Sequence, residues 1–154
     1  MTVEIGRPAP EFALRDQHGA TVSLSSFRGS RAVVLMFYPF AFSSVCSGEL
    51  SEIRENLPLF ESDDAQLLAV SCDPMFSLRA FADKDALTFP LLSDFWPHGA
   101  VSGEYGVFDA ERGCSSRSTF IIDASGVLRW SVHNAMREAR NIGDYRRVLA
   151  EIAG

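Results

Sequence analysis

Residues 32–46 join an apolar run to a loop and a cysteine, and they read Ala32-Val33-Val34-Leu35-Met36-Phe37-Tyr38-Pro39-Phe40-Ala41-Phe42-Ser43-Ser44-Val45-Cys46. The first six residues show no polar alternation, which is typical of a strand buried on both faces of a sheet. Beyond Pro39, apolar residues recur mostly every three or four positions from Val45 to Leu57. This spacing predicts an amphipathic helix that Pro58 ends.

On both sides of this segment, short apolar runs alternate with amphipathic ones. We expect strands at 67–70, 89–92, 118–122 and 127–132, helices at 76–82, 100–105 and 145–152, and a hairpin formed by 12–14 and 21–24. This order predicts an α/β protein with a thioredoxin-like fold. The fold has a central mixed sheet with parallel inner strands, helices on both faces and an N-terminal hairpin.

Length and composition narrow the function classes. A chain of 154 residues and 16.9 kDa predicts a single domain over residues 1–154, and 47% hydrophobic with 22% charged residues is typical of a globular protein. The net charge of -6 argues against nucleic acid and anionic membranes as partners. The N-terminus does not resemble a secretory signal, and residues 32–42 fall short of the roughly 20 that span a bilayer. We therefore expect a cytoplasmic protein.

Three cysteines, Cys46, Cys72 and Cys114, stand far apart in the sequence. An odd number at wide spacing is unlike a disulfide scaffold, so at least one thiol should be free. The cysteines and the three histidines lack the close spacing of a zinc site, and no Cys-x-x-Cys occurs. We expect neither a metal nor another cofactor.

Cys46 is the strongest candidate for a reactive group. The loop after the first buried strand delivers it into the first turn of the predicted helix, where free backbone N–H groups and the helix dipole favour a thiolate. In an open α/β sheet, the carboxyl ends of the strands are also where ligands bind. Ser43 can cap this helix and can donate its hydroxyl hydrogen to a substrate oxygen or to the sulfur.

Four ordered segments resemble the peroxiredoxin family. Pro39, Ser43 and Cys46 match the signature Pro-x-x-x-Thr/Ser-x-x-Cys. The other segments are Gly6-x-Pro8-Ala9-Pro10-x-Phe12, Phe89-Pro90-Leu91-Leu92-Ser93-Asp94 and Arg117-Ser118-Thr119-Phe120-Ile121-Ile122-Asp123. Within the family, Phe42 and residues 93–100 are most similar to the one-cysteine subgroup of the alkyl hydroperoxide reductase E type. The match covers nearly the whole chain.

The resemblance implies the peroxiredoxin variant of the thioredoxin fold and a thiol-dependent peroxidase. Its substrates would be hydrogen peroxide, organic hydroperoxides and peroxynitrite. Cys46 would be the nucleophile that becomes a sulfenic acid, while Arg117 and Ser43 stabilise the thiolate and hold the peroxide. The resemblance also places Pro39 over the sulfur, Phe42 beside the substrate and Glu49 against Arg117 as its orienting partner.

Three alternatives remain for the fate of oxidised Cys46. The subgroup implies one-cysteine chemistry in a homodimer, with an external thiol reductant such as mycothiol or a redoxin. A two-cysteine enzyme would resolve the sulfenic acid through Cys72, at the carboxyl end of a strand, or through Cys114, in a turn-like segment that could expose it enough to react. A non-enzymatic redox sensor or chaperone-like module would use Cys46 oxidation only to change shape.

Overall fold

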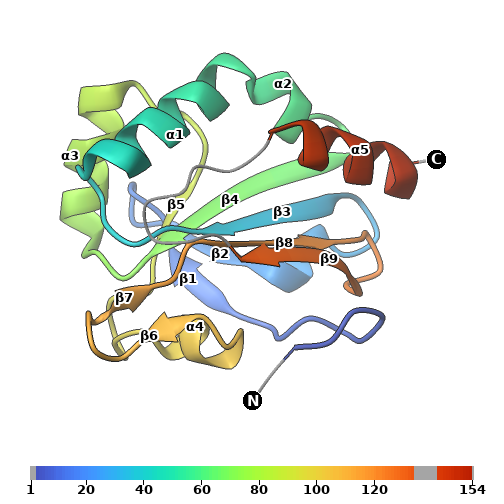
Figure 1. Cartoon of the computed structure of the whole chain (residues 1–154), viewed down its shortest axis with the longest axis horizontal. Helices are drawn as coiled ribbons and strands as arrows, with labels where there is room; N and C mark the ends of the chain where they lie inside the picture. The colour runs from blue at the N-terminus through green and yellow to red at the C-terminus, as the bar shows by residue number, and fades with distance from the viewer. Residues whose placement is uncertain (1–2, 134–141, 154) are drawn as a thin grey trace.

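A seven-stranded sheet is the centre of the computed structural model, which describes residues 3–133 and 142–153 (Figure 1). The strands run in the order β2-β1-β5-β4-β3-β8-β9, and β6 and β7 form a separate pair. The strands are β1 (Ala13–Arg15), β2 (Thr21–Ser23), β3 (Ala32–Phe37), β4 (Ala65–Ser71), β5 (Leu91–Ser93), β6 (Phe108–Asp109), β7 (Cys114–Ser115), β8 (Ser118–Ile122) and β9 (Leu128–His133). The helices are η1 (Leu24–Phe27), α1 (Ser44–Glu55), α2 (Leu57–Phe60), α3 (Met75–Asp85), α4 (Ala100–Glu104) and α5 (Ile142–Ala153).

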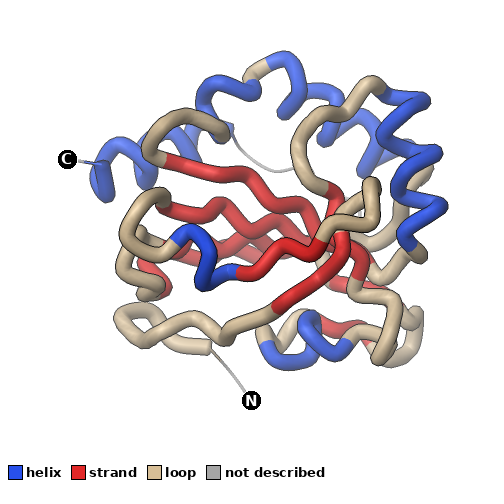
Figure 2. Tube along the Cα trace, turned by 180° about the vertical axis from the view of Figure 1, so that it is seen from behind, coloured by secondary structure: helices blue, strands red, loops and turns tan. Residues whose placement is uncertain are grey.

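The apolar run at residues 32–37 forms β3, whose side chains enter the hydrophobic cores on both faces of the sheet. β3 pairs in parallel with β4 and antiparallel with β8. Because successive side chains of a strand point to opposite faces, Val34 and Met36 enter one core while Val33 and Leu35 enter the other. Helices α1, α2, α3 and α5 cover the first face, and α4, η1 and the N-terminal segment cover the second (Figures 1 and 2).

The predicted fold class is confirmed. The sheet is mixed, helices lie on both faces, and β1 and β2 form the expected antiparallel hairpin. The strands predicted at 118–122 and 127–132 are present as β8 and β9 and pair antiparallel. No helix in the described part of the chain is both long and apolar enough to cross a membrane.

Two details differ from the expectation. The loop between β3 and α1, which we call the cysteine loop, is followed by a helix that ends at Glu55, before Pro58. Pro58 instead lies in the first turn of the separate helix α2. A proline is tolerated in a first turn because its missing N–H would have no partner there. The pair β6 and β7 was not predicted, since a strand of two residues is too short to show an apolar period.

The carboxyl ends of β3 and β4 meet at one edge of the sheet, and the amino end of β8 lies beside them. The ladder between β3 and β4 extends one residue further, where the Tyr38 N–H donates to the Val70 carbonyl at 2.9 Å. Pro39 then has no N–H to donate, and the chain leaves the sheet. On the other side of β3, Phe37 pairs with Ser118, which places Arg117 at this same edge.

Candidate active site

Cys46 lies in the first turn of α1, where the sequence placed it. Ser43 is the N-cap, and its hydroxyl oxygen accepts a hydrogen bond from the Cys46 N–H at 3.4 Å. The Cys46 side chain is completely buried in the core between α1 and the sheet. The predicted helix-terminal position of the sulfur is therefore present, inside the protein rather than on its surface.

Arg117 brings a permanent positive charge to the sulfur. Thr119 and Ile121 of β8 face the α1 layer, as their contacts with Tyr145 and with the first core show, and the period of two puts Arg117 on that face as well. Its Nη2 donates to Cys46 Sγ at 3.4 Å. The Arg117 side chain is 1% exposed, so this charge acts where water screens it little.

Glu49 is the second partner of Arg117. It lies one turn after Cys46 on α1, is itself buried, and accepts a hydrogen bond from Arg117 Nη1. The two arms of one guanidinium thus contact a carboxylate and a sulfur, and the rigid fork fixes their relative positions. The structure brings Ser43, Cys46, Glu49 and Arg117 together, in the arrangement that the resemblance implied.

The loop between β3 and α1 closes over this group. Pro39 is buried, whereas Phe42 is half exposed and has a φ of 69°, in the left-handed region that few side chains adopt. The Phe42 ring lies 5.1 Å from the Phe81 ring on α3, and Lys84 Nζ lies 5.6 Å from its centroid. Phe42 therefore lies on the outer side of the loop, against α3.

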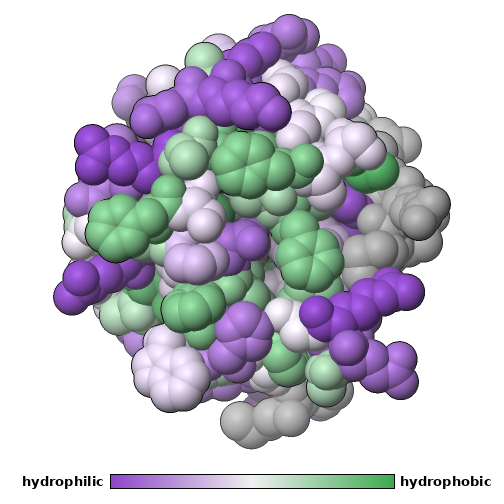
Figure 3. Space-filling view, turned by 90° about the vertical axis from the view of Figure 1, so that its left-hand side faces the viewer, coloured by the Kyte–Doolittle hydropathy of each residue, from purple (hydrophilic) through white to green (hydrophobic). Residues whose placement is uncertain are grey.

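Exposed aromatic side chains gather on the face that carries this loop. They follow the carboxyl ends of β3, β4 and β5, and we call them the aromatic rim: Phe40, Phe42, Phe76, Phe95 and Trp96. Figure 3 shows apolar rings grouped in the middle of this face among polar side chains. Phe76 is 75% exposed and Trp96 is 82% exposed. A group of large apolar side chains this exposed to solvent is typical of a surface that another molecule covers.

Two residues of the site were missed by the sequence reasoning. Asp73 follows β4, and its Oδ2 accepts from the Ala41 N–H at 2.8 Å within the cysteine loop. Tyr38 lies buried beside Cys46 in the same core, and burial raises the pKa of its phenol far above the usual value, so it stays protonated. The position of Asp73 after a buried strand was the available signal, because that edge of the sheet was already expected to carry the site.

The other two cysteines lie apart from Cys46. Leu68 and Val70 face the second core, so Cys72 points to the α4 side of the sheet. Its sulfur lies 3.6 Å from Ser115 Oγ and 4.0 Å from Ser102 Oγ, and burial raises its pKa.

The sequence placed Cys114 in a turn-like segment where it could be exposed, and the structure buries it instead. It belongs to β7 and is completely buried, because the β6 and β7 hairpin folds its strand against the body of the protein. Burial raises the pKa of the Cys114 thiol to about 11. All three cysteines are unpaired.

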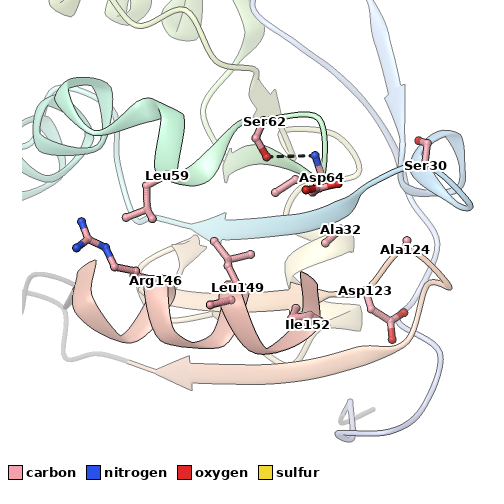
Figure 4. Close-up of a pocket in the computed structure, with 12 residues that line it drawn as sticks. Ser30, Ala32, Leu59, Ser62, Asp64, Asp123, Ala124, Arg146, Leu149 and Ile152 are labelled. Atoms are coloured by element: carbon pink, nitrogen blue, oxygen red, sulfur yellow. Dashed lines mark hydrogen bonds between the residues drawn. The ribbon is translucent and has the colours of Figure 1, made fainter. Parts of the chain in front are cut away.

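A pocket of about 450 Å³ lies at the opposite edge of the sheet (Figure 4). Ala32 and Ala65, at the amino ends of β3 and β4, line it together with Leu149 of α5. The pocket is thus separated from Cys46 by the length of strands β3 and β4. Within residues 3–133 and 142–153, no group of three or more His, Cys, Asp or Glu side chains is placed to hold a metal ion.

Residues 5–131 match the model of the AhpC/TSA family. The chain belongs to this family, the peroxiredoxins. Alkyl hydroperoxide reductase E of Mycobacterium tuberculosis is 45% identical over 139 residues, which cover 90% of this chain and 91% of that protein. This peroxiredoxin is therefore a thiol-dependent peroxidase.

Solved structures share its whole architecture. The crystal structure of peroxidoxin BcpB from Mycobacterium tuberculosis has a TM-score of 0.85 at 28% identity, covering 97% of this peroxiredoxin and 98% of that chain. The reduced 2-Cys peroxiredoxin of Plasmodium vivax has a TM-score of 0.87 at 26% identity, covering 97% and 81%. The expected family and reaction class are confirmed. The number of cysteines that take part is a separate question.

Proposed function

We propose that this peroxiredoxin reduces hydrogen peroxide, organic hydroperoxides and peroxynitrite by one-cysteine chemistry at Cys46. The observation that carries the proposal is the contact of 3.4 Å between Arg117 Nη2 and Cys46 Sγ inside a buried site. A guanidinium at this distance offers the sulfur an N–H donor and a positive charge, and the thiolate is the nucleophile. The reductant is an external thiol.

In the first step the Cys46 thiolate attacks the terminal oxygen of the peroxide. A sulfur–oxygen bond forms, the oxygen–oxygen bond breaks, and the sulfur is oxidised by two electrons to a sulfenic acid. The leaving group departs as an alcohol or water after taking a proton, or as nitrite when the substrate is peroxynitrite. Arg117 donates to the oxygens on which negative charge develops, with Ser43 and the Cys46 N–H beside it.

Glu49 and Pro39 have supporting roles in this proposal. Glu49 holds one arm of Arg117, so the other arm is aimed at the sulfur before the substrate arrives. Pro39 is buried next to the cysteine loop and keeps bulk water from the sulfur. Phe42, half exposed on the outer side of the loop, offers an apolar surface to the alkyl part of an organic hydroperoxide at the entrance of the site rather than beside the sulfur.

The second step reduces the sulfenic acid. A thiol such as mycothiol, or a redoxin thiol, attacks the sulfur, releases water and forms a mixed disulfide, and a second thiol then releases Cys46. Cys72 and Cys114 are poorly suited to replace the external thiol. Both are buried with raised pKa values, and Cys72 faces the other side of the sheet. A cytoplasmic location, where thiols are kept reduced, suits this chemistry.

The decisive experiment is intact mass and thiol counting after one equivalent of hydrogen peroxide, with dimedone present to trap sulfenic acid. We expect one dimedone adduct on Cys46 and two free thiols. The Cys46→Ser protein should consume no peroxide, while the double variant Cys72→Ala, Cys114→Ala should remain as fast as the parent. Loss of two thiols without an adduct would instead indicate two-cysteine chemistry and contradict the external reductant.

The aromatic rim supports a homodimer as the working form. Aromatic side chains are enriched at protein interfaces, and a second copy of the chain would cover Phe76 and Trp96. Sedimentation equilibrium should therefore give twice the chain mass of 16.9 kDa. Trp96→Glu should shift the protein toward the monomer, whereas Ile5→Glu, at an exposed apolar residue outside the rim, should not.

A further inference from the structure

The Asp73 carboxylate joins the carboxyl end of β4 to the cysteine loop. Its Oδ2 accepts from the backbone N–H of Ala41 and from the hydroxyl of Ser71, each at 2.8 Å. The Asp73 backbone is held as well, because its carbonyl accepts from Ser93 Oγ at 2.6 Å. This acceptor is therefore anchored to two neighbouring strands, β4 and β5.

The cysteine loop needs such an anchor. It has left the sheet at Pro39, and Phe42 adopts a φ of 69°, a left-handed conformation that is unfavourable for a residue with a side chain. Ala41 immediately precedes this strained position, and Ser43 immediately follows it. The hydrogen bond to Asp73 thus holds the loop at the point from which the N-cap of α1 is presented.

We propose that Asp73 is a positioning residue of the peroxidase site, whose carboxylate holds Ala41 so that Ser43 and Cys46 meet Arg117. The inference rests on the proposed function and extends it to a residue that contacts neither the sulfur nor the peroxide. The consequence for catalysis is geometric. A shift of the loop would move the Cys46 N–H and the sulfur together, away from an arginine that Glu49 holds in place.

The negative charge of Asp73 disfavours a second negative charge nearby, whereas its carboxylate oxygen holds the loop through a hydrogen bond. A carboxylate near the site raises the energy of a second anion. Asparagine has nearly the same shape, keeps a carbonyl oxygen for the Ala41 N–H, and carries no charge. The pair Asp73→Asn and Asp73→Ala therefore separates a role of the hydrogen bond from a role of the charge.

The experiment measures two rate constants for each variant, one with hydrogen peroxide and one with iodoacetamide. Alkylation needs the thiolate but not a cradle for peroxide oxygens. For Asp73→Ala we expect the peroxide rate constant to fall about 10- to 100-fold, the effect of a misplaced reacting group. Alkylation should fall less, because it loses only the stabilisation of the sulfur by Arg117, whereas the peroxide reaction also loses the alignment of the loop with the peroxide oxygens. Asp73→Asn should restore the peroxide rate constant to within about threefold of the parent.

Asp123→Ala is the matched control. Like Asp73, Asp123 accepts two hydrogen bonds through one oxygen, here both from backbone N–H groups, in the turn between β8 and β9 at the opposite end of the strands. Its loss should lower the melting temperature without lowering the peroxide rate constant. Should Asp73→Ala fail to fold, Asp73→Ser is measured in its place, because its shorter side chain also loses the reach to Ala41.

Three results would overturn the proposal: an unchanged peroxide rate constant in Asp73→Ala, an Asp73→Asn protein as slow as Asp73→Ala, or equal losses toward peroxide and iodoacetamide. An unchanged Asp73→Ala protein would show that the hydrogen bond is not needed. A slow Asp73→Asn protein would show that the negative charge of Asp73 is required. Equal losses with both reagents would show that the whole site is disordered. Failure of the proposed function is separate, since the parent protein would then lack peroxidase activity that depends on Cys46.

Discussion

At the scale of single residues, the site depends on the two arms of one guanidinium. Arg117 contacts Glu49 through Nη1 and Cys46 through Nη2, and both contacts are buried. A lone buried charge is costly, and the carboxylate offsets that cost while it fixes the plane of the fork. In the proposed mechanism, the Arg117–Glu49 pair therefore supplies both the electrostatic stabilisation of the sulfur and the geometry of the site.

Replacing Arg117 separates the contribution of its positive charge from that of its forked N–H groups. Arg117→Ala should lower the second-order rate constant with hydrogen peroxide by about 10²–10³, the usual loss for one charge-stabilising donor. Arg117→Lys keeps the charge but has no fork, so it should fall between the alanine variant and the parent. Stopped-flow oxidation of the reduced protein measures all three.

Arg129→Ala is the control for this series. It removes an arginine that forms a half-exposed ion pair with Asp123, so its rate constant should equal that of the parent. A lysine variant as fast as the parent would show that the charge alone is sufficient and that the fork has no catalytic role.

At the scale of elements, strand pairing determines where the chemistry lies. The antiparallel register of β3 with β8 places Arg117 beside the loop that leads to Cys46, although the two residues are 71 positions apart. The parallel pairing of β3 with β4 brings Asp73 to the same loop. A shift of either register by one residue would turn the site residues to the other face of the sheet.

The loop that carries Cys46 also depends on a contact with α3. Lys84 lies over the Phe42 ring, and such a contact contributes about 0.5–1 kcal/mol at an exposed position. Lys84→Met should therefore open the loop about two- to fivefold more often. The rate of Cys46 modification by a bulky maleimide reports this opening, because the closed site buries the sulfur.

Lys84→Arg is the matched variant, since it keeps a cation over the ring. Its maleimide rate should equal that of the parent protein. Equal rates for the methionine variant and the parent would mean that the cation does not hold the loop, and that the Phe81 contact alone does so.

The sequence predicted the elements well and the contacts between distant residues less well. The buried strands β3 and β8 and the helix behind Cys46 were recognisable because apolar runs and helical spacing are local signals. The burial of Cys114 was not recognisable, because β6 and β7 are too short to show a pattern. Their packing against the rest of the protein depends on residues that are distant in the sequence. Asp73 was missed for the same reason, since its partner Ala41 lies 32 positions away.

At the scale of the whole molecule, burial of thiols and phenols makes stability depend on alkaline pH. Burial raises the pKa of Cys114 from 9.0 to about 11, and it raises that of Cys72, Tyr38 and Tyr105 as well. The unfolded chain loses the Cys114 proton near pH 9, whereas the folded chain keeps it until about pH 11. The free energy of unfolding should therefore fall as the pH rises through this window.

Urea unfolding at pH 8.0 and at steps up to about pH 11 checks this expectation. Cys114→Ala, which has no titrating group at this position, should show a shallower decline than the parent. An unfolding free energy that is constant across the window would contradict the buried, protonated thiol.

The chain contains a single lysine, Lys84, and its amine lies over the Phe42 ring, in the loop that leads to Cys46. Amine-selective labels at neutral pH thus have two targets, this side chain and the N-terminus. A fluorophore attached to Lys84 by reductive alkylation, which keeps the positive charge of the amine, would sit next to Phe42 and report each opening of the loop as a change in emission. The molecule therefore carries a natural attachment point for following its own catalytic cycle in real time, without an engineered cysteine.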